Sequence, residues 1–437
     1  MAAVVSPGKS AGSEKVPSSG SGFLPAEPRT IEETGLGFGF LADLAIKILY
    51  FHGSMPAFGV AEAMRLPFVG VVEKVLDFLK KEEFCSVIGS AGLSPAAYHY
   101  QITQKGVRKA QENLERCRYA GPAPVPLEAH NRAVVKQSIA NVTVGEDALR
   151  QAFSHMVLSK SVLDQLGPAI NSGKSIFLFG PPGNGKTTIA RSIATLLGGD
   201  IFIPFSVEAD GQIIKVFDPV HHSAIDPSKH KIQGYDRRWV YSKRPVVIVG
   251  GELTIDMLDL VYNNVSKDYE APFQMKANGG MFLIDDFGRQ QIRPRVLLNR
   301  WVVPLENRCD YFTLHTGKKI EVPFDQLIIF STNLEPKELV DEAFLRRIRY
   351  KIHVGSPTLA EYREIFRRVC EQRGVPYDEA SLIYLIKENY RSEADLRACH
   401  PRDLVEQLID TAQYLGVPAA LSKQLMDLSC QSYFVRL

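Results

Sequence analysis

The stretch that decides the fold is Gly180–Thr187, which reads GPPGNGKT. Four apolar residues, 176–179, precede it, and a run with helical character, 188–197, follows. The pattern G-x-x-x-x-G-K-[ST] between a buried strand and a helix is typical of a loop whose backbone N–H groups surround phosphate oxygens. Glycine is needed there because side chains would obstruct the approach. An ordinary glycine turn before a helix is the alternative, and it is disfavoured because strand and helix both lie where the motif requires them.

This phosphate-binding loop, called the P-loop below, predicts ATP and Mg²⁺ as cofactors. Lys186 should meet the β- and γ-phosphates as a point charge, and the Thr187 hydroxyl should bind Mg²⁺. The residues expected to bind the nucleotide are Gly180, Pro181, Pro182, Gly183, Asn184, Gly185, Lys186, Thr187 and Thr188.

Two acids follow a second apolar strand, 281–284. Asp285 and Asp286 stand where a Walker B site has its acids, so Asp285 should organise Mg²⁺ and Asp286 should orient and polarise the attacking water. Apolar residues followed by two acids are also common at ordinary strand ends. The P-loop upstream favours the metal and catalytic interpretation.

Other polar residues occupy positions where a nucleotide enzyme needs them. Asn333 follows a third apolar strand, 327–330, and could contact both the γ-phosphate and the attacking water, although asparagine is also a routine turn former. Arg346 and Arg347 end a short helix, where cations also complement the helix dipole. Arg402 lies in the first turn of a helix that HPRDL opens, where the dipole disfavours it, so we expect it to have an anionic partner.

Composition excludes several classes of protein. The chain has 437 residues, 45% of them hydrophobic and 23% charged, with a net charge of +2, so a general attraction to nucleic acid or membranes is not expected. Its apolar runs are too short or too charged for a membrane helix. The first 22 residues have no apolar core of a secretory signal, so we expect a cytoplasmic location. The six cysteines form no CxxC pair, and we expect them reduced.

Composition also divides the chain. We expect a disordered tail over 1–35, because it is poor in large apolar residues. A compact unit should cover 36–119, and a proline-rich linker should cover 120–141. The nucleotide-binding α/β unit should cover 142–356, and a helical unit 357–437.

The unit 36–119 shows three helical stretches, then alternating residues from Tyr98, then another helix. The third helical stretch runs from Phe68 to Leu79. This order, together with the sequence YHYQITQKGVRKA, resembles a winged helix-turn-helix domain. Such a domain can bind DNA or dock protein. Its candidate recognition helix alternates acids and bases and has no arginine or asparagine to read base edges, so docking is favoured.

From about Val142 onward, the order and spacing of these motifs resemble an AAA+ ATPase, within it the MoxR-type, chaperone-like group. The resemblance implies an α/β P-loop core, a five-stranded parallel sheet with helices on both faces, followed by a C-terminal helical lid. It also implies that Asn333 is sensor 1, that Arg402 is sensor 2, and that Arg346 or Arg347 is an arginine finger reaching a neighbouring subunit. A site completed by a neighbour implies a homo-oligomeric ring, usually a hexamer.

The chain departs from this family in two places. The second Walker B acid is usually Glu, and Asp286 is one methylene shorter. The segment 211–253 is longer than the usual connection and contains Tyr235, Arg237, Arg238 and Trp239. These residues could line a pore or bind a substrate, but a β-hairpin insertion with one buried tryptophan is favoured.

The sequence therefore predicts an ATP hydrolase that remodels a macromolecular partner, with protein favoured as the substrate. The winged helix would serve as its adaptor. The alternative is an ATP-switched transcriptional regulator that binds DNA through the winged helix and turns over little ATP.

Overall fold

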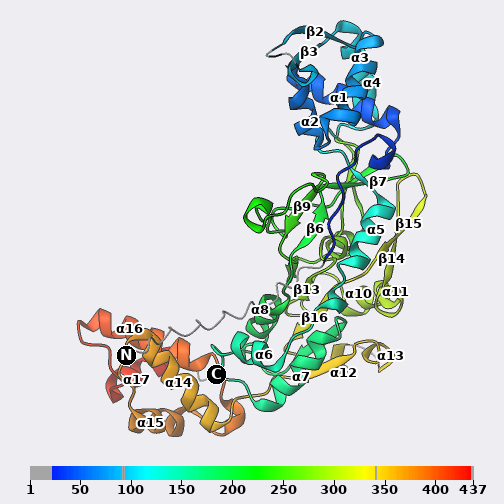
Figure 1. Ribbon diagram of the computed structural model, residues 1–437. Coiled ribbons are helices and arrows are strands. Elements are labelled where there is room, and N and C mark those ends of the chain that lie inside the picture. The colour runs from blue at the N-terminus through cyan, green and yellow to red at the C-terminus, as the bar shows by residue number, and fades with distance from the viewer. Residues whose placement is uncertain (1–21, 91, 93, 340–341, 435–437) are drawn as a thin grey trace, which may run out of the picture.

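The computed structural model describes residues 22–90, 92, 94–339 and 342–434. The molecule is elongated and curved (Figure 1), with the N-terminal helices at one end, the sheets in the middle and the C-terminal helices at the other end. No helix in these ranges is long and apolar enough to cross a bilayer. The six cysteines are all free thiols.

A parallel sheet forms the centre, in the order β10-β13-β16-β5-β17. The five strands are β5 (Ser175–Phe179), β10 (Val246–Val249), β13 (Met281–Ile284), β16 (Leu327–Thr332) and β17 (Tyr350–His353). Alternate residues of β5, β10, β13 and β16 belong to two separate cores, one on each face, whereas the edge strand β17 contributes Tyr350 and Ile352 to one core only. The uninterrupted apolar runs therefore form a sheet buried on both sides, and the predicted α/β fold with a five-stranded parallel sheet is confirmed.

Helices cover both faces of this sheet. One face packs against residues of α6 (Glu146–Ala152), α7 (Lys160–Asn171) and α8 (Lys186–Leu196). The other packs against residues of α10 (Pro294–Arg300) and α13 (Glu342–Leu345), with Trp301 fully buried. The remaining short helices of this region are α9 (Phe273–Lys276), α11 (Val302–Asn307) and α12 (Pro336–Leu339).

A second sheet lies between the parallel sheet and the N-terminal helices, in the order β11-β12-β8-β7-β4. Its strands are β4 (Val125–Pro126), β7 (Ser206–Ala209), β8 (Gln212–Lys215), β11 (Val261–Asn263) and β12 (Asp268–Glu270). Two strand pairs flank it, namely β6 (Ile201–Pro204) with β9 (Trp239–Ser242), and β14 (Cys309–Thr313) with β15 (Lys319–Pro323).

The aromatic and basic cluster in 211–253 lies in this middle region. Trp239 is buried, as expected. It lies on β9, which pairs with β6, and β6 lies outside the segment 211–253. The predicted β-hairpin insertion within 211–253 was therefore only partly right. Arg238 is buried as well, and Arg237 pairs with Glu62 of the N-terminal unit. The cluster therefore joins two parts of the molecule.

The N-terminal unit has four helices and a three-stranded antiparallel sheet in the order β1-β3-β2. Its elements are α1 (Phe38–His52), β1 (Ser54–Pro56), α2 (Ala57–Met64), α3 (Glu73–Lys81), β2 (Cys85–Ser90), β3 (Tyr98–Ile102) and α4 (Gln104–Arg116). The helix expected from Phe68 does not begin there. Gly70 has a φ of 80°, and a side chain at this position would lie 2.4 Å from the Arg29 carbonyl oxygen, so the chain bends and α3 begins at Glu73.

The predicted disordered tail was wrong for residues 22–35, whereas residues 1–21 lie outside the described ranges. The ring of Phe23 packs edge-on against Trp239, with the centroids 6.0 Å apart. The N–H of Asp236 donates to the Pro25 carbonyl oxygen at 2.8 Å. A segment poor in apolar residues is thus ordered by a few contacts with a distant part of the chain.

The predicted linker was also wrong in part, because α5 (Leu127–Lys136) begins within it. The helix buries Ala133 and His130, and Gln137 just beyond it exchanges two hydrogen bonds with the backbone of Phe202. The apolar face of α5 packs on the middle region. The prolines before α5 therefore lead into a packed helix and do not form a flexible linker.

The C-terminal unit consists of helices. They are α14 (Leu359–Arg373), α15 (Glu379–Asn389), α16 (His400–Leu415) and α17 (Lys423–Tyr433), and they share one apolar core. Thr358 and Glu361 form a capping box at the start of α14. Pro401 lies in the first turn of α16, as the sequence predicts.

Candidate nucleotide site

The P-loop connects β5 to α8, and its three glycines all have the positive φ that it requires. Gly180, Gly183 and Gly185 have φ angles of 136°, 78° and 81°. A side chain at Gly180 would lie 2.3 Å from the Val354 carbonyl oxygen. Glycine is therefore needed for the backbone path and for the packing against the end of β17.

Lys186 begins α8 and is only 6% exposed. Its Nζ donates to the carbonyl oxygens of Gly180 and Pro181, both at 2.9 Å. Burial lowers the pKa of Lys186, while Asp286 and Asp285 raise it. The loop thus curls around an ammonium group at the start of a helix, where the backbone N–H groups also favour an anion.

The predicted Walker B acids lie beside this lysine. The Thr187 hydroxyl hydrogen-bonds to the Asp285 carboxylate, 2.9 and 3.0 Å from its two oxygens. Asp286 follows with a φ of 50°, which turns the chain at the end of β13, and its side chain is exposed. Asn333, at the end of β16, donates from Nδ2 to Asp286 Oδ1 at 3.3 Å. The structure therefore brings together the residues predicted from three separate strand ends.

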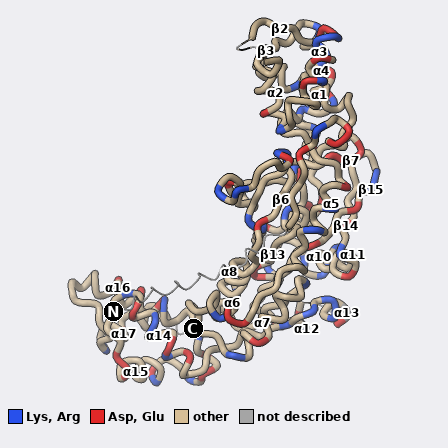
Figure 2. The backbone as a smooth tube through the Cα atoms, viewed as in Figure 1, with Lys and Arg blue, Asp and Glu red and all other residues tan. Residues whose placement is uncertain are grey.

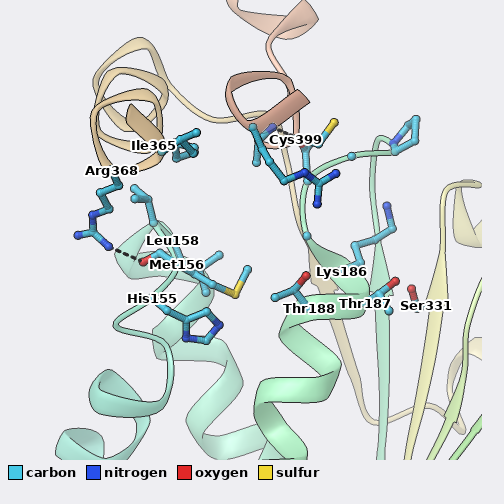
Figure 3. A pocket seen from close by; sticks show the side chains of 18 of the residues that line it. His155, Met156, Leu158, Lys186, Thr187, Thr188, Ser331, Ile365, Arg368 and Cys399 are labelled. Carbon is cyan, nitrogen blue, oxygen red and sulfur yellow. Dashed lines mark hydrogen bonds between the residues drawn. The ribbon is translucent and has the colours of Figure 1, made fainter. Parts of the chain in front are cut away.

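A cavity of about 460 Å³ opens beside these residues and is lined from two sides. The central unit contributes Pro182–Thr188, Asp286 and Asn333, and the C-terminal unit contributes α14 and the start of α16. Figure 3 shows Lys186, Thr187 and Ser331 on one side and Cys399 across from them. The far end of the cavity is apolar, with Met156 and Leu158 facing Ile365.

Arg402 lines this cavity from the first turn of α16. Its Nε donates to Asp403 Oδ1 at 2.9 Å, and this hydrogen bond raises the pKa of Arg402. In this structure the anionic partner of Arg402 is Asp403, the next residue of the chain. Arg402 is largely exposed, so its pairing with Asp403 is screened by water.

The two candidate finger arginines lie elsewhere. Arg346 is exposed, and Arg347 donates from Nε to Glu306 Oε1 on α11 at 2.6 Å. Among the described residues that line the cavity, neither is present. The structure thus does not bring them to the nucleotide site of their own chain.

Sequence reasoning missed two side chains at the site. Gln290 donates from Nε2 to the carbonyl oxygens of Asp285 and Asp286, and its Oε1 accepts from the Gly288 N–H, so it fixes the turn after β13. Arg368 on α14 donates to the carbonyl oxygen of Ser154 at 2.9 Å (Figure 3 shows its longer bond to Met156). Both bind backbone atoms, which no residue pattern reveals.

The residues present fit ATP and Mg²⁺. A hydroxyl and a carboxylate held together, Thr187 and Asp285, are the oxygen donors that Mg²⁺ prefers. The buried Lys186 and the glycine backbone match a phosphate.

Comparison with known proteins agrees with this geometry. Residues 176–249 match the sequence model of the ATPase family associated with various cellular activities (AAA). This segment is similar to AAA ATPase domains. The match confirms the predicted AAA-type ATP hydrolase domain at the P-loop. The AAA domain is followed by a second match, over residues 358–432, to a domain of unknown function (DUF8689), which covers the C-terminal helices.

Relatives and solved structures extend the comparison. The chain is 25% identical over 258 residues to Spastin of Drosophila grimshawi, covering 58% of this chain and 26% of that protein. It is 24% identical over 258 residues to Spastin of Anopheles gambiae, covering 58% and 25%. The chain thus spans about a quarter of the length of the curated relatives it matches.

Two solved structures align over a longer part of the chain. The RuvB Holliday junction branch migration motor of Thermotoga maritima aligns with a TM-score of 0.35 and 14% identity, over 67% of this chain and 72% of that one. NtrX of Brucella abortus, in complex with ADP, aligns with a TM-score of 0.37 and 16% identity, over 74% and 65%.

Proposed function

We propose that the whole chain is a cytoplasmic AAA+ ATPase that uses ATP hydrolysis to remodel a macromolecular partner, with protein as the expected substrate. The observation that carries this proposal is the cavity shared by the AAA domain and the C-terminal helices. Because both units line the site, replacing ATP by its hydrolysis products would change the contacts of each unit with the nucleotide. Hydrolysis can therefore move one unit against the other. The C-terminal helices would then act as the lid.

The side chains of the site divide the work between binding and hydrolysis. Lys186 and the P-loop N–H groups would hold the phosphates, and Thr187 with Asp285 would hold Mg²⁺. When bound, the metal supplies charge neutralisation at the phosphates. Asp286, oriented by Asn333, would polarise the attacking water. Arg402 would reach the nucleotide from the lid, as sensor 2 does in the AAA+ family.

The N-terminal unit would act as a winged-helix adaptor for protein. Its order of helices and its three-stranded sheet support that fold. Figure 2 shows acidic and basic residues interspersed over α3 and α4. The basic side chains of α4 are partly engaged within the chain, since Lys105 donates to the Glu82 carbonyl oxygen and Lys109 pairs with Glu112. Such a surface favours protein over the phosphate backbone of DNA.

We also propose a homo-oligomer, with a hexameric ring as the expected form, in which Arg346 or Arg347 completes a neighbour's site. Neither arginine is among the described residues that line the cavity of its own chain, which supports this arrangement. The MoxR-type, chaperone-like assignment is retained as part of the proposal.

The proposal is tested by separating binding from turnover. Lys186→Ala should weaken ATP binding roughly 100-fold, because the cation nearest the transferred phosphate is lost. Asp286→Asn should bind ATP normally and lose roughly 100-fold in turnover, because the water loses its polarising carboxylate. Calorimetry with ATP·Mg²⁺ and phosphate release measure the two effects. Wild-type turnover in Asp286→Asn would remove Asp286 from catalysis, and turnover in Lys186→Ala would overturn the site.

A further inference from the structure

The segment just before α16 lies directly against the P-loop. The N–H of Cys399 donates to the Gly183 carbonyl oxygen at 2.9 Å, and the N–H of Ala398 donates to Asn184 Oδ1 at 3.1 Å. A side chain at Gly183 would lie 2.6 Å from the Cys399 Sγ. The contact is thus so close that Gly183 is needed for it as well as for its own φ of 78°.

Asn184 is the one side chain of the P-loop that bonds to the C-terminal unit in these described contacts, and it is only 4% exposed. Its orientation is assigned by the Ala398 N–H, because only the amide oxygen can accept that bond. The Nδ2 group is buried and has no partner among the described residues. A buried donor without a partner costs free energy, so Asn184 is held in this position against that cost.

This contact lies at the start of α16. Cys399 caps the helix, and Arg402 follows in its first turn, facing the same cavity as Lys186. A shift of residues 398–399 relative to the P-loop would shift Arg402 with them, because a helix turn is a rigid element.

We propose that Asn184 is a positioning residue, which clamps the start of α16 to the P-loop and so sets the place of Arg402 at the nucleotide site. The inference rests on the proposed ATPase function. Under this proposal, the C-terminal helices follow the conformation of the P-loop through the N–H groups of Ala398 and Cys399.

A native thiol reports on the clamp without any nucleotide. Cys399 is half-buried against the P-loop, whereas Cys370 and Cys430 are buried within the C-terminal helices. We would alkylate the full chain with iodoacetamide and measure each cysteine by mass spectrometry. Asn184→Ala should raise the rate at Cys399 about fivefold or more by local opening. Asn184→Asp keeps an acceptor for Ala398 and should stay close to wild type, and Cys370 and Cys430 should not change.

Kinetics test whether the clamp acts through Arg402. Asn184→Ala should lower kcat about tenfold and change the KM for ATP by less than about threefold, because Lys186 and the loop N–H groups remain. Asn184→Ala combined with Arg402→Ala should be no slower than Arg402→Ala alone, since both changes remove the same interaction.

Unchanged alkylation of Cys399 in Asn184→Ala would overturn the clamp, and additive losses of kcat would overturn its action through Arg402. If Asn184→Ala also exposes Cys370 and Cys430, the variant has unfolded. Gly183→Ala then replaces it, because the added methyl group should displace Cys399 and raise its alkylation. If the wild type binds ATP without hydrolysing it, the proposed function fails, while the alkylation result still decides the clamp.

Discussion

The central unit is joined to its two neighbours in contrasting ways. At the N-terminal joint, the Arg238 guanidinium is 4% exposed and binds Asp236 together with the carbonyl oxygens of Thr34 and Pro124. At the C-terminal joint, neutral backbone groups pair Asn184 with the start of α16. Arg368 adds a hydrogen bond to the Ser154 carbonyl oxygen.

This difference indicates which joint should move. The buried Arg238 guanidinium, which Asp236 holds within the central unit, would lose both carbonyl acceptors if the N-terminal joint opened, and hydrogen bonds from a charged group are stronger than neutral ones. A few hydrogen bonds at the edge of a cavity exchange readily for water or a ligand. We therefore expect the N-terminal and central units to move together, and the C-terminal unit to respond to the nucleotide.

The largest expected effect follows from breaking the N-terminal joint. Arg238→Ala leaves Asp236 buried and unpaired, and should lower the free energy of unfolding by about 3 to 5 kcal/mol. Urea unfolding measures it. The matched control is Arg237→Ala, whose half-exposed pair with Glu62 should contribute about 1 kcal/mol or less. Equal losses in the two variants would contradict the contrast between buried and exposed pairs.

Acid should weaken the central unit through a buried histidine. Burial lowers the pKa of His130 to about 4 from its usual value near 6.5. Between these values the unfolded chain binds the proton and the folded chain does not, so stability is present above pH 6.5 and is lost as the pH falls toward 4. The loss from this group is about 3 kcal/mol at most.

Urea unfolding at several pH values tests this prediction. His130→Gln should flatten the dependence of stability on pH in this window, whatever its effect at neutral pH. His222, whose pKa is also lowered to about 4 by burial, should retain its own contribution. An unchanged slope in His130→Gln would mean that His130 is not held neutral by the fold.

The smallest expected effect comes from the C-terminal joint. Arg368→Ala removes the hydrogen bond to Ser154 beside the cavity, and should raise the KM for ATP about fivefold, the equivalent of one such bond. The unfolding free energy should change by no more than about 1 kcal/mol. The control is Arg367→Ala, because Arg367 pairs only with Glu364 and Glu371 of its own helix in the described contacts. A similar rise in KM for both variants would show that α14 acts through its charge and not through this contact.

Much of the nucleotide site could be predicted from the sequence because its signals are local. The P-loop is one continuous motif, and Asp285 and Asn333 each end an apolar strand. The carboxyl ends of parallel strands meet at one edge of a sheet, so these residues had to converge.

The joints could not be predicted, because they depend on partners far apart along the chain. Asn184 and Ala398 are 214 residues apart. Arg238 binds the carbonyl oxygens of Thr34 and Pro124, and a backbone acceptor leaves no mark in the residue pattern. The ordering of residues 22–35 has the same origin, since Phe23 is one aromatic residue in a polar stretch.

The position of Phe23 against Trp239 also provides an optical probe. The chain has two tryptophans. Trp301 is fully buried behind the parallel sheet, whereas Trp239 lies where the segment 22–35 crosses the middle region. With Trp301 replaced by phenylalanine, the emission of Trp239 would report the detachment of this segment without a signal from the indole behind the parallel sheet. Fluorescence could then separate the release of the N-terminal segment from the unfolding of the central sheet in a single protein.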